Sequence, residues 1–167
     1  MRYAPVAVAL SLVVAMTGSM GSAKGTVENP RAEALIKDGR ASLVKGDVGT
    51  AIDNFEAALA IDPGNAAPLI GLAEAARRDG LQGKAIRYYR QALDRDPNNV
   101  VAISGEGGAM VEKGALEKAR RNLTRLEGLC GKGCTETADL AAAIARGPAP
   151  RVVSAEAVKP DPKIETN

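Results

Sequence analysis

The sequence predicts an all-α protein built as a helical solenoid, and three observations support this prediction. Apolar residues recur along the 167 residues with the spacing of one helix face. The chain has one Phe, three Tyr and no Trp, so its core must consist mainly of small and aliphatic side chains, which suit closely packed helices. Gly interrupts the helical pattern at the equally spaced positions Gly46, Gly80 and Gly114. A fixed period of about 34 residues indicates a repeated pair of helices.

The first pair of helices is expected over 32–45 and 48–61. Gly46 separates them, because Gly adopts the positive φ that often ends a helix. Phe55 lies on an apolar stripe of the second helix, and Pro63 stops that helix since Pro cannot continue it. Neither helix can bury its stripe alone, so the pair must stack on a neighbour.

The second pair repeats this plan over 66–79 and 82–95. The segment AIRYYRQALDRDP aligns with AIDNFEAALAIDP one repeat period earlier, which places Tyr89 at the position of Phe55. Asn65 precedes the first helix of this pair as a good N-cap. The match predicts that the two pairs have the same structure.

The third pair is expected over 100–113 and 116–129, after Asn98 or Asn99 as a cap. Here Leu123 stands at the position of the aromatic residue, and the final Pro is missing. The units are therefore 32–65, 66–99 and 100–133.

A seventh helix is expected over 135–146, with Thr135 as a candidate cap and Leu140 on its apolar face. We expect it to cover the exposed end of the third pair. Residues 24–31 are expected to be a leader, and residues 147–167, with four prolines, a disordered tail.

Residues 1–23 have the order of a secretory signal peptide. Arg2 precedes an apolar run, and small residues lead to Ala23. The run is about 13 residues long, short of the roughly 20 that cross a bilayer. We expect cleavage after Ala23, no stable membrane insertion afterwards, and a periplasmic or secreted protein; an uncleaved anchor is the alternative.

The repeated unit resembles the tetratricopeptide repeat (TPR), over residues 32–131. The chain departs from that pattern because it has no Trp. The resemblance implies a right-handed solenoid of about three helix pairs with a C-terminal capping helix. It also implies an exported bacterial adaptor that binds a peptide or helix in a concave groove, in the assembly of envelope, pilus or secretion machines. The resemblance to the tetratricopeptide repeat rests on Ala51, Phe55, Pro63, Ala85, Tyr89 and Pro97.

The resemblance further implies that the first helix of each pair lines the groove. The expected lining mixes apolar and charged side chains, which suits an amphipathic helix or an extended segment; ordinary helix surface is the alternative. Gly71, Gly105 and Gly108 are expected to keep the groove open, since they have no side chains. The expected lining is Glu33, Ile36, Lys37, Arg40, Leu43, Val44, Ile70, Glu74, Arg77, Arg78, Val101, Ser104, Val111 and Glu112.

Cys130 and Cys134 stand in LCGKGC, between the sixth and seventh helices. A structural disulfide suits an oxidising compartment and a flexible Gly-containing loop, and would fix the seventh helix to the sixth. A redox-active pair is the second interpretation, although the spacing differs from thioredoxin-type motifs. A metal site is the third, but two cysteines alone are an incomplete ligand set.

The composition argues against other classes of function. Lys and Arg number 22 against 20 Asp and Glu, whereas nucleic-acid binders carry a basic excess. We expect the charged helix faces to be solvated, with Arg90–Asp94 and Glu117–Arg121 as ion pairs; a patch for an acidic partner is the alternative. The chain has no His and no phosphate-binding or nucleophile motif.

We therefore predict a noncatalytic protein-interaction module with no catalytic residue, metal or cofactor. Two alternatives remain open. One is a thiol-redox protein that uses Cys130 and Cys134, and the other is a structural protein that assembles with its own copies.

Overall fold

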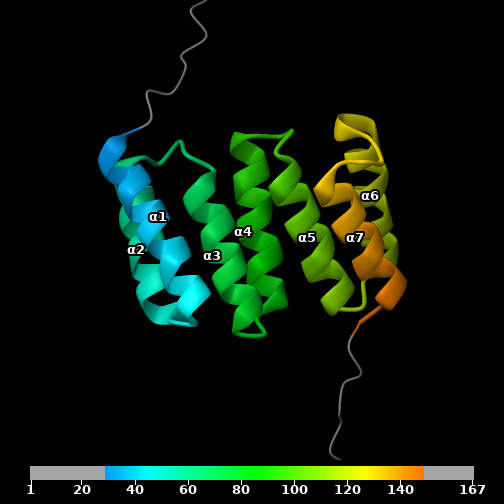
Figure 1. Ribbon diagram of the computed structural model, residues 1–167, viewed down its shortest axis with the longest axis horizontal. Helices are drawn as coiled ribbons and strands as arrows, with labels where there is room; N and C mark the ends of the chain where they lie inside the picture. Colours follow the sequence, from blue (N-terminus) through cyan, green and yellow to red (C-terminus); the bar gives the residue numbers. More distant parts are fainter. Residues whose placement is uncertain (1–28, 149–167) are drawn as a thin grey trace, which may run out of the picture.

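The computed structural model describes residues 29–148, which contain helices and no strand (Figure 1). Each predicted helix is confirmed, with ends that differ by two residues at most. The predicted signal peptide and almost all of the leader and tail lie outside the described residues. The helices are α1 (Pro30–Lys45), α2 (Val48–Ile61), α3 (Ala67–Arg78), α4 (Gln82–Arg95), α5 (Val100–Glu112), α6 (Leu116–Cys130) and α7 (Thr135–Arg146).

The helices form two layers (Figure 1). Helices α1, α3, α5 and α7 lie side by side in the front layer of the view, and α2, α4 and α6 lie behind them. Within each pair the two helices pack together, and each pair contacts the next through its neighbouring helices. Helix α7 packs on both α5 and α6. The fold is an all-α helical repeat solenoid, as the sequence predicts.

Caps and glycine turns set the helix ends. The side chain of Asn99 accepts a hydrogen bond from the backbone N–H of Ala102 (3.0 Å), and Asn65 does the same for Ala67 (2.9 Å). Gly46 has a φ of 82° and accommodates the tight turn between α1 and α2. The predicted cap at Thr135 is wrong, because Cys134 occupies the N-cap and no side chain caps α7.

The core is built around two aromatic rings. Phe55 and Tyr89 are almost fully buried, and small residues lie against them. A Cβ placed on Gly71 would lie only 2.4 Å from Phe55, and one on Gly105 would lie 2.3 Å from Tyr89. These two glycines therefore make room for core rings. The prediction that Gly71 keeps the groove open is wrong, whereas Gly105 also lines a surface hollow.

None of the helices in residues 29–148 has the length and apolar character needed to span a membrane.

Candidate functional site

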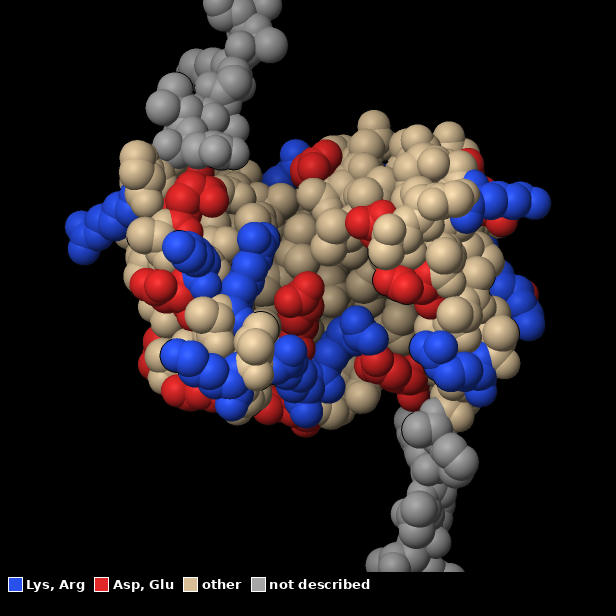
Figure 2. All heavy atoms as spheres, in the orientation of Figure 1, with Lys and Arg blue, Asp and Glu red and all other residues tan. Residues whose placement is uncertain are grey.

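Three adjoining hollows lie on the face formed by the front layer, and Arg77 of α3 borders all of them. The first, of about 350 Å³, is lined by Glu74, Arg77, Arg78 and Glu112. The other two, of about 250 and 240 Å³, lie between α5 and α7 and share Gly108, Ala143 and Arg146 as well as Arg77. Figure 2 shows this face, which is hollowed near its centre and carries most of its charge along the lower half. We call the three hollows together the groove.

Arg77 is held in place across the groove. Its Nε lies 3.2 and 3.3 Å from the two carboxylate oxygens of Glu112 on α5, and Nη2 completes the ion pair. Gly108 makes this approach possible, since a Cβ there would lie 3.0 Å from Nη2 of Arg77. The guanidinium group is therefore positioned before any ligand arrives.

Tyr89 and Arg77 affect each other's pKa. Burial raises the pKa of the Tyr89 hydroxyl to about 12, and the neighbouring Arg77 opposes this shift. Burial alone would lower the pKa of Arg77, but the bond to Glu112 and the contact with Tyr89 outweigh it and raise that pKa above its ordinary value. Arg77 is thus a permanent cation in the groove.

Glu74 of α3 lies beside Arg77 in the first hollow. Burial raises the pKa of this carboxyl above its ordinary value, and Arg40, Arg77 and Arg78 partly offset the effect. Arg78 donates from Nη1 to the backbone carbonyl of Leu43, which ties the end of α3 to the end of α1. This part of the groove is therefore rigid and rich in charge.

Helix α7 forms the far wall of the groove. The Ser104 hydroxyl of α5 donates to the backbone carbonyl of Glu136 (3.1 Å), at the start of α7. Leu140 of α7 is buried against Gly107, where a Cβ would lie 2.6 Å from the leucine side chain. These contacts place Asp139 and Arg146 along one edge of the groove.

The structure places the predicted lining residues in three groups. Ile36, Leu43 and Ile70 are buried in the core cluster, so their predicted place on the groove surface is wrong: they lie on the faces that pack against neighbouring helices. Lys37, Arg40, Val44 and Val101 are exposed but border none of the three hollows, and Glu33 is half-buried and bonded to Asn65. The predicted residues that do line the groove are Glu74, Arg77, Arg78, Ser104, Val111 and Glu112.

The sequence analysis missed the lining residues of α7. Asp139 and Arg146 stand one repeat period after Gly105 and Glu112, so they occupy the positions of groove residues in a fourth unit. The repeat period thus indicates two groove positions in α7, whereas the sequence-based prediction gives this helix only a capping role.

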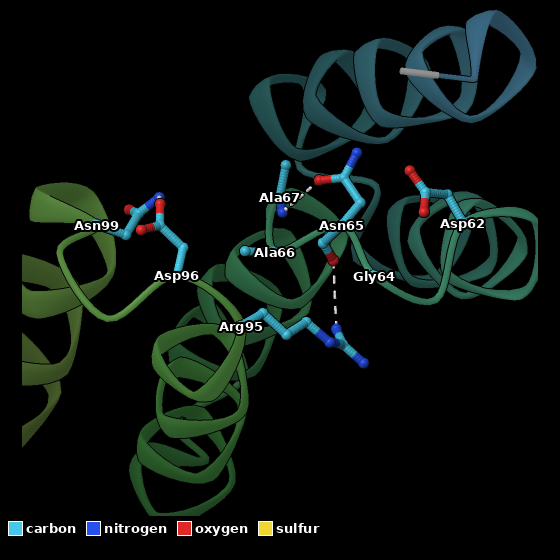
Figure 3. Close-up of a pocket in the computed structure, with 8 residues that line it drawn as sticks. All are labelled: Asp62, Gly64, Asn65, Ala66, Ala67, Arg95, Asp96 and Asn99. Carbon is cyan, nitrogen blue, oxygen red and sulfur yellow. Dashed lines mark hydrogen bonds between the residues drawn. The ribbon is translucent and has the colours of Figure 1, made fainter. Parts of the chain in front are cut away.

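A further hollow of about 350 Å³ lies between the loops that follow α2 and α4 (Figure 3). Arg95 crosses it and donates from Nη1 to the backbone carbonyl of Asn65 (3.2 Å). The amide of Asn65 donates to Glu33, and its oxygen accepts from the backbone N–H of Ala67, although Ala66 and not Asn65 occupies the N-cap of α3. The polar groups of Asn65 are thus used in joining one pair of helices to the next.

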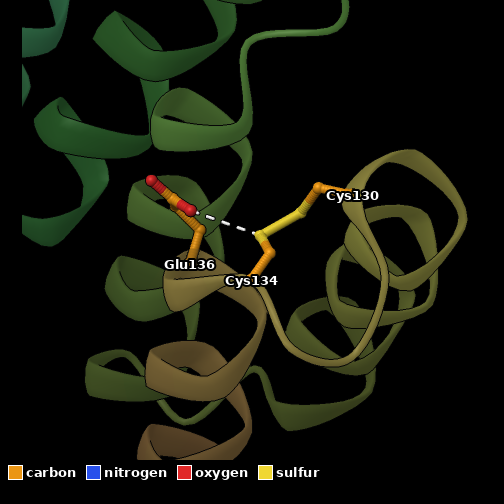
Figure 4. Close-up of side chains that lie close together, drawn as sticks. All are labelled: Cys130, Cys134 and Glu136. Carbon is orange, nitrogen blue, oxygen red and sulfur yellow. Dashed lines mark hydrogen bonds between the residues drawn. A yellow bond between two sulfur atoms is a disulfide. The ribbon is translucent and has the colours of Figure 1, made fainter.

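Cys130 and Cys134 meet at the junction of α6 and α7 (Figure 4). Their sulfur atoms are at bonding distance, 2.06 Å apart, and a carboxylate oxygen of Glu136 lies 3.2 Å from Cys134 Sγ. Cys130, Cys134 and Glu136 bring three potential ligand atoms together. With the sulfurs joined, neither offers the thiolate that a metal requires.

The stacked helix pairs and the groove define the class of protein: this is a tetratricopeptide-repeat protein. More particularly, residues 37–158 match the family model described as protein kinase G tetratricopeptide repeat, and the chain belongs to that family. No curated protein sequence matches the chain.

Several solved structures share the fold. The TPR domain of Sgt2 from Aspergillus fumigatus is 26% identical, with a TM-score of 0.62 over 76% of this chain and 91% of that domain. The second TPR domain of human RPAP3, in complex with the HSP70 peptide SGPTIEEVD, is 21% identical, with a TM-score of 0.61 over 69% of this chain and 95% of that one. The Yersinia enterocolitica type III secretion chaperone SycD, in complex with a peptide of the translocator YopD, is 18% identical, with a TM-score of 0.61 over 72% and 92%.

Proposed function

We propose that this protein is a noncatalytic adaptor that binds a peptide segment of a partner protein in the groove. The observation that carries the proposal is the set of three adjoining hollows that meet at Arg77. The RPAP3 and SycD structures support it, since both hold a peptide.

The groove is suited to transient binding. It is short: within residues 29–148 its lining comes from α3, α5, α7 and the adjoining Gly147, and Glu112 already holds Arg77 in place. A pre-formed site loses little conformational freedom on binding, so a short peptide can gain useful affinity there. Backbone and side-chain contacts along a groove of this kind are typical of peptide recognition.

Selection of random 12-residue peptides displayed on phage tests the proposal. The full chain without residues 1–23 is the target, and enriched peptides are synthesised and titrated by fluorescence anisotropy. We expect Arg77→Ala to weaken binding at least tenfold, because it removes a side chain that borders all three hollows. Arg87→Ala is the matched control: this arginine is exposed on α4 and borders none of the described hollows.

Two results would count against the proposal. One is the absence of any enriched peptide, and the other is an equal loss of affinity in both variants. Circular dichroism must first show that the two variants are equally helical.

We further propose that the protein acts in the bacterial periplasm, in the assembly of an envelope, pilus or secretion machine. The order of residues 1–23 supports export, and the SycD structure shows that a chaperone of a secretion system has this fold. Expression of the full chain in a Gram-negative host, followed by fractionation and N-terminal sequencing, tests the location. We expect a periplasmic product that begins at Lys24; a cytoplasmic product that begins at Met1 would contradict it.

A further inference from the structure

The cleft between α5 and α7 carries opposite charges at its two ends. Asp139 and Arg146 both line it, and they stand seven residues apart on α7. Seven residues span about 10 Å along a helix. An acidic end and a basic end are therefore separated by about two helical turns.

Both charges are free to meet a ligand. Asp139 and Arg146 are exposed, and within residues 29–148 neither belongs to an ion pair or a side-chain hydrogen bond. The other charged groups that border the cleft, Arg77 and Glu112, neutralise each other. The lining between the two ends includes the small residues Gly108 and Ala143, beside Leu140.

The size of the cleft limits what can enter. Its two hollows measure about 250 and 240 Å³, whereas an α-helix with its side chains is about 10 Å across. An extended segment in the polyproline II conformation fits better, and it advances about 3.1 Å per residue with three residues per turn. Two of its side chains that are three residues apart therefore point to the same side and lie about 9 Å apart, close to the separation of the two charges.

We propose that the cleft binds an extended partner segment with a basic side chain at Asp139 and an acidic side chain three residues away at Arg146. Because Gly108 and Ala143 have small side chains, the backbone of the segment can lie close to the lining between the two charges. This inference rests on the proposed peptide-binding function and gives the chemistry of its ligand. It makes α7 part of the binding site, in addition to its role in covering the end of the solenoid.

Exchange of the two charges tests the proposal. Peptides are selected from the same 12-residue phage library on the natural chain and on the variant Asp139→Arg, Arg146→Asp. We expect peptides with a basic and an acidic residue three apart from the natural chain, and the inverse charge order from the variant. A peptide selected on one chain should bind the other three- to fivefold more weakly, as exposed ion pairs contribute modestly.

The chain offers a closely matched control. Arg87 and Asp94 are also seven residues apart, exposed and opposite in charge, but they lie on α4 and border none of the described hollows. The variant Arg87→Asp, Asp94→Arg should select the same peptides as the natural chain. If the exchanged variant on α7 is poorly folded, the neutral variants Asp139→Asn and Arg146→Gln replace it, and each should remove the charge preference at one position only.

The possible results separate this inference from the function on which it rests. Peptides that depend on Arg77 but show no charge order, or that ignore the exchange on α7, would overturn the inference and leave the adaptor function standing. If no peptide is enriched, both fail. If peptides are enriched only on a chain that ends at Pro148, residues 149–167 of the protein compete for the cleft, and the occupant is the chain itself.

Discussion

The first two pairs of helices close their cores differently from the third pair. Phe55 of α2 and Tyr89 of α4 are both almost fully buried, and each ring lies against glycine in the front layer. In α6 the equivalent residue, Leu123, is only partly buried. A large ring therefore fills the junction in the first two pairs, and no such ring is present in the third.

Helix α7 supplies what the third pair lacks. Its Leu140 packs against Gly107, which stands one repeat period after Ala73 and two periods after Gly39. Thr137 is the other buried side chain of α7. The first two junctions are thus filled from within the repeat, whereas the last depends on a helix held by few buried groups. Because α7 has two buried residues and also forms one wall of the groove, the proposed peptide binding requires a weakly anchored helix.

The largest effect is expected from Phe55→Ala. Removal of a fully buried aromatic ring costs about 4 kcal/mol, as lost burial and an unfilled cavity add together. The equivalent change in the third pair, Leu123→Ala, should cost only about 1 kcal/mol because that side chain is partly exposed. Urea denaturation followed by circular dichroism measures both values, and equal losses would show that the two junctions do not differ.

Leu140→Ala should have the next largest effect, about 3 kcal/mol. We expect the loss to be local, since helices at the end of a solenoid contact only their neighbours. Hydrogen exchange should show faster exchange in α7 and unchanged protection in α1 and α2. Ile144→Ala is the control, as this side chain is partly exposed and should change the exchange of α7 less. Faster exchange throughout the chain would mean that α7 is not a separate unit.

Alkaline pH should distinguish Tyr89 from Phe55. The pKa of Tyr89 is raised to about 12 from an ordinary value of 10.0, so the folded protein holds this proton more tightly than the unfolded chain does. The stabilisation is complete below pH 10 and is lost as the pH rises toward 12, by about 2–3 kcal/mol.

Tyr89→Phe makes the second junction resemble the first and should remove this loss. Urea midpoints at pH 9 and pH 11.5 provide the measurement. If the variant and the natural protein lose stability in parallel between these pH values, the titration of Tyr89 does not account for the alkaline loss.

The fixed repeat period explains why so much of the fold could be predicted. Helix ends follow from local chemistry: Gly46 turns with positive φ, Asn99 caps α5, and Asn65 accepts a hydrogen bond from the first residue of α3. Such signals act within a few residues and can be read directly from the sequence.

The groove was harder to predict because its lining depends on how helices rotate against one another. Ile36 and Leu43 are one or two residues from exposed positions on α1, and a small error in rotation moves them from the surface to the core. The predicted ion pair between Arg90 and Asp94 is wrong for a similar reason. Arg90 pairs with Glu106 of α5, a different helix, and not with Asp94 on its own. Glu117 does pair within its own helix, but with Arg120 and not with the predicted Arg121. The local spacing of charges therefore did not identify either partner.

The smallest effect is expected from the bond between Cys130 and Cys134. A loop this short restricts the unfolded chain only modestly, so its closure stabilises by about 2 kcal/mol. The bond joins the end of α6 to the start of α7, and the stabilisation should therefore appear in α7 alone. We expect the variant Cys130→Ser, Cys134→Ser to show faster hydrogen exchange in α7, and dithiothreitol to have the same effect on the natural protein but none on the variant. Mass spectrometry after alkylation checks that the bond forms. Free thiols in the purified protein, or an α7 that exchanges equally with and without the bond, would leave Leu140 and Thr137 as the groups that hold this wall of the groove.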